Sequence, residues 1–270
     1  MSTFLITGAS GFLGTSLCEE LSKEGHSIIG TVFSEKNAQI FMKNFPKVKT
    51  YLVDISSDRR EIEKIFYQNE IDYVVHCAAM KHVNLCQHNP SRCIKTNIFG
   101  PLFISELCLK YGVKNLLAVS TDKSKNPICT YGYSKRLMEL ALLEQGHSIY
   151  RGVNFFGSTG SVINIWLDQM KSGKHLSVNS NNTVRYFIDC KEVVAEILDN
   201  IDRKGVVLPK KSYKVSLHDL CSAFCKFYMY DNVRYFKPTG YEKLEEEIDQ
   251  EIEIVSLGVD EIIDTFLRRL

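Results

Sequence analysis

The feature that most constrains the fold of this chain is a glycine-rich loop close to residue 1. The loop reads Gly8-Ala-Ser-Gly11-Phe-Leu-Gly14, follows an apolar segment at residues 4–7 and opens a helical pattern over 12–24. Glycines at such a junction permit a tight turn, close approach of a pyrophosphate and close packing of helix on strand. The amides at the start of the helix then bind the anion. The loop predicts a dinucleotide-binding unit, with a glycine turn that binds no ligand as the alternative.

The first half of the chain alternates between apolar strand patterns and amphipathic helical patterns. Strands are predicted over 4–7, 27–33, 50–53, 73–76, 115–119 and 148–153, and helices over 12–24, 59–69, 94–111 and 131–143. Such alternation implies right-handed crossovers and a parallel sheet covered on both faces. We therefore predict an α/β fold with a Rossmann-type doubly wound parallel sheet over residues 1–153.

The alternation becomes less regular after residue 153. Helices are predicted over 161–172, 191–202 and 260–270, and strands near 176–178 and 206–208. Residues 231–250 are charged and show no regular period. We predict a smaller substrate-binding lobe over residues 154–270, with the chain partly returning to the first domain near 188–208.

Composition excludes several classes of partner. Thirty-three Lys and Arg against 32 Asp and Glu give a formal net charge of +1, which predicts neither a nucleic-acid partner nor a membrane partner. No apolar run reaches the ~20 residues of a membrane span, and no signal-peptide pattern precedes the glycine loop, so we expect a cytoplasmic protein. Nine scattered Cys form no CxxC pair, and the His and Cys residues over 76–88 lack the usual zinc spacing, so we expect no metal.

The residues after the second predicted strand bear on which dinucleotide is bound. An NAD enzyme usually has Asp or Glu there to accept hydrogen bonds from the ribose hydroxyls. Ser34 and Lys36 could instead receive a 2′-phosphate, although Glu35 would repel it if it pointed inward. The sequence therefore favours NADP. Asp54, after the third strand, is a candidate partner of the adenine amino group, with a simple turn residue as the alternative.

Tyr131 and Lys135 form the candidate catalytic pair. Their spacing of four places them on one face of the helix predicted over 131–143. A neighbouring ammonium favours the phenolate, so we expect Tyr131 to exchange a proton with a substrate hydroxyl while hydride is transferred. Tyr133 lies only two residues before Lys135 and does not fit this spacing. The pair alone is a weak signal, but here it follows the glycine loop and a strand that ends in Ser120-Thr-Asp-Lys123.

With these motifs the chain resembles the extended short-chain dehydrogenases/reductases. Within them it looks like the nucleotide-sugar 4,6-dehydratases of polysaccharide and flagellin-glycan synthesis, especially the inverting UDP-N-acetylglucosamine 4,6-dehydratases. The similarity covers most of the chain and is most specific over the first 135 residues. The stretches that carry it are 76–83, Asn89-Pro90, 93–100, 120–123, Asn126-Pro127 and 131–135, with weaker similarity at Asn154, 160–162, 185–187 and 240–244.

The resemblance implies a role for each residue of the active site. Tyr131 and Lys135 would oxidise the sugar C4 hydroxyl, with Thr121 hydrogen-bonding beside them. The C4 ketone acidifies the C5 hydrogen, which Lys123 would remove while Asp122 protonates the departing C6 hydroxyl. Hydride would then return to C6, and reprotonation of C5 from the opposite face would invert it. Because Lys123 and Lys135 converge near one sugar ring, we expect Lys123 to lose its proton near neutral pH.

The resemblance also implies two sets of binding residues. The cofactor set is Gly8, Ser10, Gly11, Phe12, Leu13, Gly14, Ser34, Lys36, Asp54, Ile55, Ala78, Ala79, Lys81, Asn97, Tyr131 and Lys135. The set for the UDP-sugar substrate is Lys81, His82, Asn154, Ser161, Val162, Arg185 and Lys243.

The chain departs from the family pattern in the predicted substrate lobe. It is shorter than typical members, Thr159 stands where an Arg is usual, and Pro238-Thr239 replaces the Arg expected before Gly240. Arg commonly holds a diphosphate, so three alternatives stay open: a 4-ketoreductase, a 4-epimerase and a non-catalytic NADP-binding regulator. The Asp122-Lys123 pair favours dehydration.

A final expectation concerns assembly. In this superfamily the helices at 94–111 and 131–143 commonly pair subunits, and Phe99, Phe103 and Leu107 supply an apolar stripe. We expect a homo-oligomer, at least a dimer, with burial in the monomer core as the alternative for each of the three residues.

Overall fold

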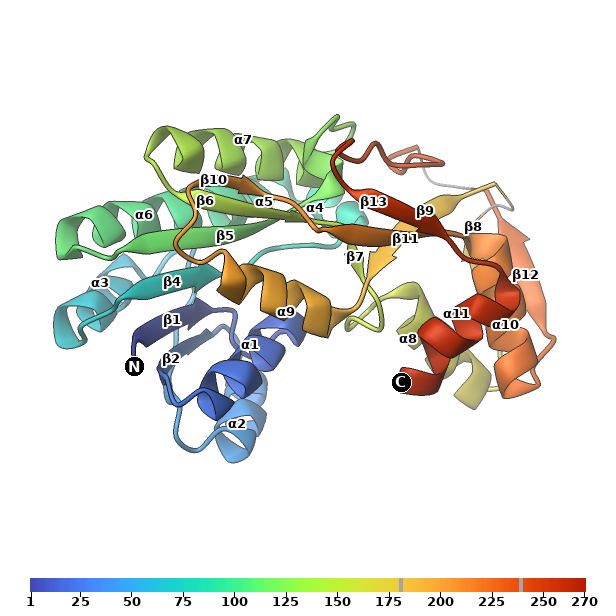
Figure 1. Ribbon diagram of the computed structural model, residues 1–270, viewed down its shortest axis with the longest axis horizontal. Coiled ribbons are helices and arrows are strands. Elements are labelled where there is room, and N and C mark those ends of the chain that lie inside the picture. Colours follow the sequence, from blue (N-terminus) through green and yellow to red (C-terminus); the bar gives the residue numbers. More distant parts are fainter. Residues whose placement is uncertain (180–181, 238–239) are drawn as a thin grey trace.

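The computed structural model describes residues 1–179, 182–237 and 240–270. Its largest element is a seven-stranded sheet with the strand order β10-β6-β5-β4-β1-β2-β3 (Figure 1). Every neighbouring pair in this sheet is parallel. The strands are β1 (Thr3–Thr7), β2 (Ser27–Val32), β3 (Lys49–Leu52), β4 (Tyr73–His76), β5 (Asn115–Thr121), β6 (Ser148–Gly152) and β10 (Gly205–Val207).

Helices cover both faces of the sheet, and each face buries its own apolar core (Figure 1). One face packs against α1 (Phe12–Lys23), α2 (Glu35–Asn44) and α9 (Cys190–Asp199). The other face packs against α3 (Arg59–Gln68), α6 (Gly100–Tyr111) and α7 (Thr130–Glu144). The predicted fold class, a doubly wound parallel sheet, is confirmed.

The single helix predicted over 94–111 is interrupted. The chain forms α4 (Val83–His88) and α5 (Pro90–Ile94), and then a π-helical turn (Lys95–Phe99) before α6 begins. Pro101 explains the wider turn, because its ring would clash with the carbonyl of Asn97 in a continuous α-helix and it has no amide to donate. The turn buries Asn97 completely.

The remainder of the chain builds a second body around a third apolar core. A four-stranded sheet has the order β13-β11-β9-β7, and β12 pairs with β8. The elements are β7 (Asn154–Phe155), α8 (Val162–Lys171), β8 (Leu176–Asn179), β9 (Val184–Ile188), β11 (Lys211–Ser216), α10 (Leu217–Tyr228), β12 (Val233–Phe236), β13 (Glu253–Ser256) and α11 (Val259–Thr265). Between these elements, α9 and β10 return to the seven-stranded sheet. Among the described residues, no helix has the length and apolar composition that crossing a membrane requires.

Several of these elements were not predicted from the sequence. They are α2, α4, α5, β7, β9, β11, α10, β12 and β13. In β11 only Ser212 and Val215 are buried, so the strand shows almost no apolar alternation. Within the charged stretch predicted to be irregular, β12 is the exception, and the described residues from 240 to 250 form neither helix nor strand.

Candidate active site

A cavity of about 730 Å³ lies at the carboxyl ends of the parallel strands. Its wall includes Gly8 after β1, Asp54 after β3, Ala78 after β4, Thr121 at the end of β5 and Val153 after β6. Strands β1 and β4 are neighbours from which the chain winds in opposite directions, and this is where open α/β sheets bind ligands. The cavity also holds most residues of the predicted cofactor set.

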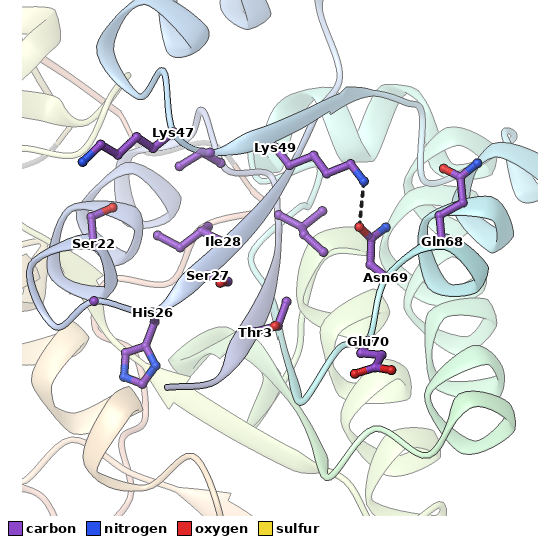
Figure 2. A pocket seen from close by; sticks show the side chains of 13 residues that line it. Thr3, Ser22, His26, Ser27, Ile28, Lys47, Lys49, Gln68, Asn69 and Glu70 are labelled. Atoms are coloured by element: carbon purple, nitrogen blue, oxygen red, sulfur yellow. Dashed lines mark hydrogen bonds between the residues drawn. The ribbon is translucent and has the colours of Figure 1, made fainter.

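A second hollow of similar size, about 740 Å³, lies at the amino ends of β1, β2 and β3 (Figure 2). Thr3, Ser27 and Lys49 are among its lining residues, and the Lys49 ammonium donates to the Asn69 amide oxygen at 2.8 Å. This hollow contains neither the glycine loop nor the Tyr131 and Lys135 pair. The chemistry suggested by the sequence therefore belongs to the cavity at the carboxyl ends.

The glycine loop has the close packing that a dinucleotide site requires. Gly8 has a φ of +65°, and a Cβ added there would lie 2.9 Å from the backbone of Ala78. A Cβ on Gly14 would lie 2.4 Å from the carbonyl oxygen of Gly8. Helix α1 begins at Phe12, and among the described residues no side chain caps its first amides. The loop therefore presents free amide donors to a diphosphate, which fits the predicted cofactor.

At the end of the cavity near β2 and β3, the residues that line the wall differ from those predicted to bind the cofactor. The Ser34 hydroxyl accepts the Asn37 amide at 3.2 Å and so caps α2. Lys36 is exposed on α2, and neither Ser34 nor Lys36 lines the cavity. The lining residues here are instead Thr31, Phe33, Asn37, Val53, Asp54, Ile55 and Arg92.

Asp54 is held in place by its neighbours. One carboxylate oxygen accepts the amide and hydroxyl of Ser56 at 2.9 and 2.7 Å, and the other accepts Arg92 Nη2 at 2.7 Å. Partial burial acts to raise the pKa of Asp54, but the Ser56 hydrogen bonds and the Arg92 guanidinium outweigh it and hold that pKa below its usual value. Arg92 was not predicted as a site residue, because it follows the turn at Asn89-Pro90 and no local pattern relates it to Asp54, 38 residues earlier.

At the other end of the cavity, α7 places Tyr131 and Lys135 in the wall. The Lys135 ammonium is 3% exposed and donates to the Val119 carbonyl at 2.7 Å. Burial lowers the pKa of Lys135 to about 8, although the Glu139 carboxylate acts in the opposite direction. Lys135 is therefore a buried ammonium in contact with the backbone of β5.

The expectation that Lys135 favours the Tyr131 phenolate is wrong for this arrangement. Burial raises the pKa of Tyr131 above its usual value, and the Asp122 carboxylate raises it further. Hydrogen bonding to Thr121 acts the other way but does not outweigh them. Burial and the Asp122 carboxylate therefore oppose ionisation of Tyr131 in this arrangement.

Asp122 and Lys123 follow β5 directly, as the sequence predicted. Asp122 is 4% exposed and accepts the Thr121 hydroxyl at 2.8 Å and the Lys123 ammonium at 3.0 Å. The second Asp122 oxygen, Oδ2, is buried and has no hydrogen-bond partner among the described residues. Thr121 and Lys123 line the cavity, whereas Asp122 lies behind its wall.

A carboxylate from the end of the chain reaches this pair. The buried Glu246 lies 3.7 Å from the Lys123 ammonium and 3.7 Å from that of Lys243. Lys123 thus contacts two carboxylates, Asp122 and Glu246, and it lines the same cavity as Lys135. Glu246 was missed because nothing in the charged stretch over 231–250 distinguishes it from its neighbours.

A buried ion network fixes the residues behind the site. The Arg151 guanidinium on β6 donates to both oxygens of Glu139 on α7, at 3.0 and 2.8 Å. It also donates to both oxygens of Asp249, at 3.2 and 3.1 Å. The Ser124 hydroxyl adds a 2.6 Å bond to Glu139. The network ties the catalytic helix to the segment that carries Glu246, which lies near the start of α7 in Figure 1.

The loop after β4 contributes the remaining predicted residues of the cofactor set. Ala78, Ala79 and Lys81 line the cavity, whereas Asn97 does not. The Asn97 side chain instead accepts the Met80 amide at 2.8 Å and donates to the Met80 carbonyl at 2.9 Å. Asn97 therefore holds the loop that forms the wall.

The predicted substrate residues divide into two groups. His82 and Asn154 line the cavity with Lys81, whose ammonium donates to the Thr159 carbonyl at 2.6 Å. The other predicted substrate residues do not line the cavity. Ser161 and Val162 begin α8, and Arg185 donates to the Lys243 and Leu244 carbonyls. Lys243 lines a small adjoining hollow with Glu246. Pro238-Thr239 lies outside the described residues.

The chain is similar to known proteins in sequence and in fold. The family model described as "Polysaccharide biosynthesis protein" matches residues 4–258. The chain is 28% identical over 235 residues to the UDP-N-acetylglucosamine 4,6-dehydratase (inverting) of Campylobacter jejuni, covering 81% of this chain and 70% of that protein. It is also 28% identical over 242 residues to the UDP-glucose 4-epimerase of Rickettsia akari, covering 82% and 69%. The crystal structure of DesIV, a dTDP-glucose 4,6-dehydratase from Streptomyces venezuelae with NAD bound, matches with a TM-score of 0.82 at 18% identity, over 92% of this chain and 88% of that one.

Proposed function

This chain belongs to the polysaccharide biosynthesis protein family, and from that premise we propose that it is an NADP-dependent nucleotide-sugar 4,6-dehydratase. The proposed substrate is UDP-N-acetylglucosamine, with inversion at C5. The observation that carries the proposal is the Asp122-Lys123 pair, which follows Thr121 directly and lies beside Tyr131. Dehydration needs an acid and a base in addition to the pair that oxidises C4, and these two residues supply them.

In the first step Tyr131 removes the proton of the C4 hydroxyl, with Thr121 hydrogen-bonded beside it. A nicotinamide dinucleotide held at the glycine loop and beside Lys135 would supply the hydride acceptor for C4 and the hydride donor for C6. Because burial and Asp122 hold the pKa of Tyr131 above its usual value, this step is favoured when that pKa falls in the loaded site. Lys135 is the residue able to supply the charge, by exchanging its bond with the Val119 carbonyl for contacts nearer Tyr131.

In the second step Lys123 takes the C5 proton and Asp122 protonates the departing C6 hydroxyl. Because Asp122 lies behind the cavity wall in this structure, its carboxyl group must move into the cavity for this step. Lys123 must first transfer its own proton. Its hydrogen-bond acceptor is Oδ1 of Asp122 at 3.0 Å, and the second oxygen of that carboxylate, Oδ2, has no hydrogen-bond partner among the described residues. Moving a proton from Lys123 to Asp122 would create the base and the acid together. Glu246, on the other side of Lys123, opposes this transfer until it moves away.

The test is to incubate the purified chain with NADP and UDP-N-acetylglucosamine and to follow the sugar nucleotide by mass spectrometry. We expect the loss of one water and, in deuterium oxide, one deuterium at C5 with inverted configuration. A product of unchanged mass with inverted C4 would instead identify a 4-epimerase. The similarity to the Rickettsia akari epimerase and the ion pairs that hold Lys123 favour this second candidate.

We also propose that the chain divides at about residue 153 into a cofactor domain and a smaller substrate lobe, and that it self-associates. Leu107 is 3% exposed and belongs to the monomer core, whereas Phe99 is 52% exposed. On α7, Tyr133, Leu137 and Leu140 are each about half exposed, which extends the apolar stripe. We expect light scattering to show at least a dimer at micromolar concentration and Leu137→Glu to give a monomer; a monomeric parent chain would contradict this.

A further inference from the structure

The adenosine end of the cavity contains no acidic side chain at the place where NAD enzymes usually carry one. Strand β2 ends at Val32 and is followed by Phe33, which is 65% exposed and lines the cavity. Thr31 and Asn37, its neighbours in the wall, are uncharged. Phe33 cannot accept hydrogen bonds from ribose hydroxyls, so the wall lacks the usual recognition group for NAD.

Arg92 from α5 supplies a cation at this end. Its guanidinium lies 5.6 Å from the centre of the Phe33 ring, and Nη2 donates to Asp54 at 2.7 Å. The Arg92 side chain is 45% exposed, and Nη2 is its only guanidinium nitrogen with a hydrogen bond recorded among the described residues. Packing against Phe33 and the bond to Asp54 fix the planar group, while most of its donors stay available to a ligand.

The charge of the whole cavity fits a cofactor with more than one phosphate group. Its lining residues include four cations, Lys81, Arg92, Lys123 and Lys135, and one carboxylate, Asp54. The three lysines lie toward the catalytic end, where β4, β5 and α7 contribute to the wall. Among the described residues that line the cavity, Arg92 is the one cation near the carboxyl ends of β2 and β3, the strands that flank the adenosine ribose in this fold.

We propose that Arg92 binds the 2′-phosphate of NADP and is the residue through which this site prefers NADP to NAD. The inference rests on the proposed function only in assuming that the cavity binds a nicotinamide dinucleotide. It transfers the role expected of Ser34 and Lys36 to a residue from another helix, because Ser34 caps α2 and Lys36 lies outside the wall. Arg92 suits this role because its planar fork can bind Asp54 and a phosphate at the same time.

The test measures the dissociation constants of NADP and NAD by calorimetry, without sugar. We expect the parent chain to bind NADP more tightly and Arg92→Met to weaken NADP by about 10- to 100-fold, as for a lost charge-assisted hydrogen bond, with NAD affected less than about 3-fold. Lys36→Met is the matched control, because this exposed lysine follows the same strand outside the wall, and it should change neither constant. Arg92→Lys, which keeps the charge but loses the fork, should lie between the parent and Arg92→Met.

Removing Arg92 also leaves the Asp54 carboxylate unpaired, and this charge alone would repel a 2′-phosphate. The double variant Arg92→Met with Asp54→Asn separates the two effects. A selective loss of NADP binding that persists in the double variant supports the proposal, and recovery of NADP binding overturns it. An equal loss of affinity for NAD and NADP also overturns it, because Arg92 would then bind the adenine and not the 2′-phosphate. A parent chain that binds NAD more tightly than NADP overturns it as well. Because no sugar is present, these outcomes are independent of whether the chain dehydrates its substrate.

Discussion

The cofactor side and the far side of the candidate site are built in different ways. On the cofactor side, Gly8, Thr121 and Tyr131 occupy strand ends and helix starts, so the backbone of the doubly wound sheet places them. On the far side, Glu246 and Asp249 belong to a segment without helix or strand, and ion pairs to Lys123 and Arg151 hold them. In the proposed reaction, the sheet would determine where hydrogen is transferred, while a few charges would hold the opposite wall of the site. Substitutions on the two sides should have separable effects.

The largest effect is expected on the sheet side, from Tyr131→Phe. The change removes one hydroxyl and leaves a ring of the same shape, so the fold and cofactor binding should persist. Because Tyr131 moves the proton that permits oxidation at C4, the turnover rate should fall by ~10⁴-fold, and no reduced cofactor should form in a single turnover. Stopped-flow absorbance measures the turnover rate and the formation of reduced cofactor. Tyr133→Phe is the matched control, and an equal loss there would remove Tyr131 from the reaction.

Lys123→Met tests the residue at which the two sides meet. Removal of a proton-transfer group should slow water loss and exchange at C5 by at least ~10²-fold, while oxidation at C4, which needs only Tyr131 and Lys135, should survive. Mass spectrometry and a single-turnover absorbance trace read the two steps separately. The exposed Lys95→Met serves as the control. Dehydration at the parent rate would show that Lys123 is not the base.

Asp249→Asn tests the charges that hold the far side. Asp249 is the second carboxylate of Arg151, and its side chain is 15% exposed. Loss of this charge should lower the free energy of unfolding by about 1–2 kcal/mol, because Arg151 keeps its bonds to Glu139. It should also raise KM for the sugar nucleotide without changing cofactor affinity. Urea titration and steady-state kinetics provide the measurements, with Glu251→Gln as an exposed control. Weaker cofactor binding instead would show that the two sides are not separable.

The same contrast explains what the sequence predicted. The fold class follows from local patterns, and so do the loop at Gly8 and the pair at Tyr131 and Lys135, because each depends on residues close together in the chain. The resemblance to extended short-chain dehydrogenases/reductases is confirmed by the family match and the similar proteins. It depended on the same local motifs.

Contacts between residues that are far apart in the sequence could not be predicted from local patterns. Arg92 on α5 meets Asp54, which lies 38 residues earlier in the sequence. Glu246 meets Lys123 only because the segment before β13 returns to the site. Ser34 shows a different difficulty, since a Ser after a strand is equally typical of a phosphate ligand and a helix cap. The amide of Asn37, three residues on, is the capping partner, and that spacing was the available signal for α2.

The smallest effect concerns pH and again contrasts the two sides. Burial, with a contribution from the Lys135 ammonium, lowers the pKa of His76 to about 3, and burial with Lys204 lowers the pKa of His147. Both histidines lie in the part of the chain that forms the seven-stranded sheet. An unfolded histidine titrates near 6.5, so the folded state binds fewer protons and stability is lost as pH falls below about 6.5. His76 should account for a loss of about 1.4 kcal/mol in the free energy of unfolding between pH 7.5 and 5.5, and the loss should continue toward pH 3.

Urea titrations at pH 7.5, 6.5 and 5.5 should therefore show a smaller pH dependence of the free energy of unfolding in His76→Gln than in the parent chain. An unchanged slope in both His76→Gln and His147→Gln would place the acid sensitivity in the carboxylates of the far side.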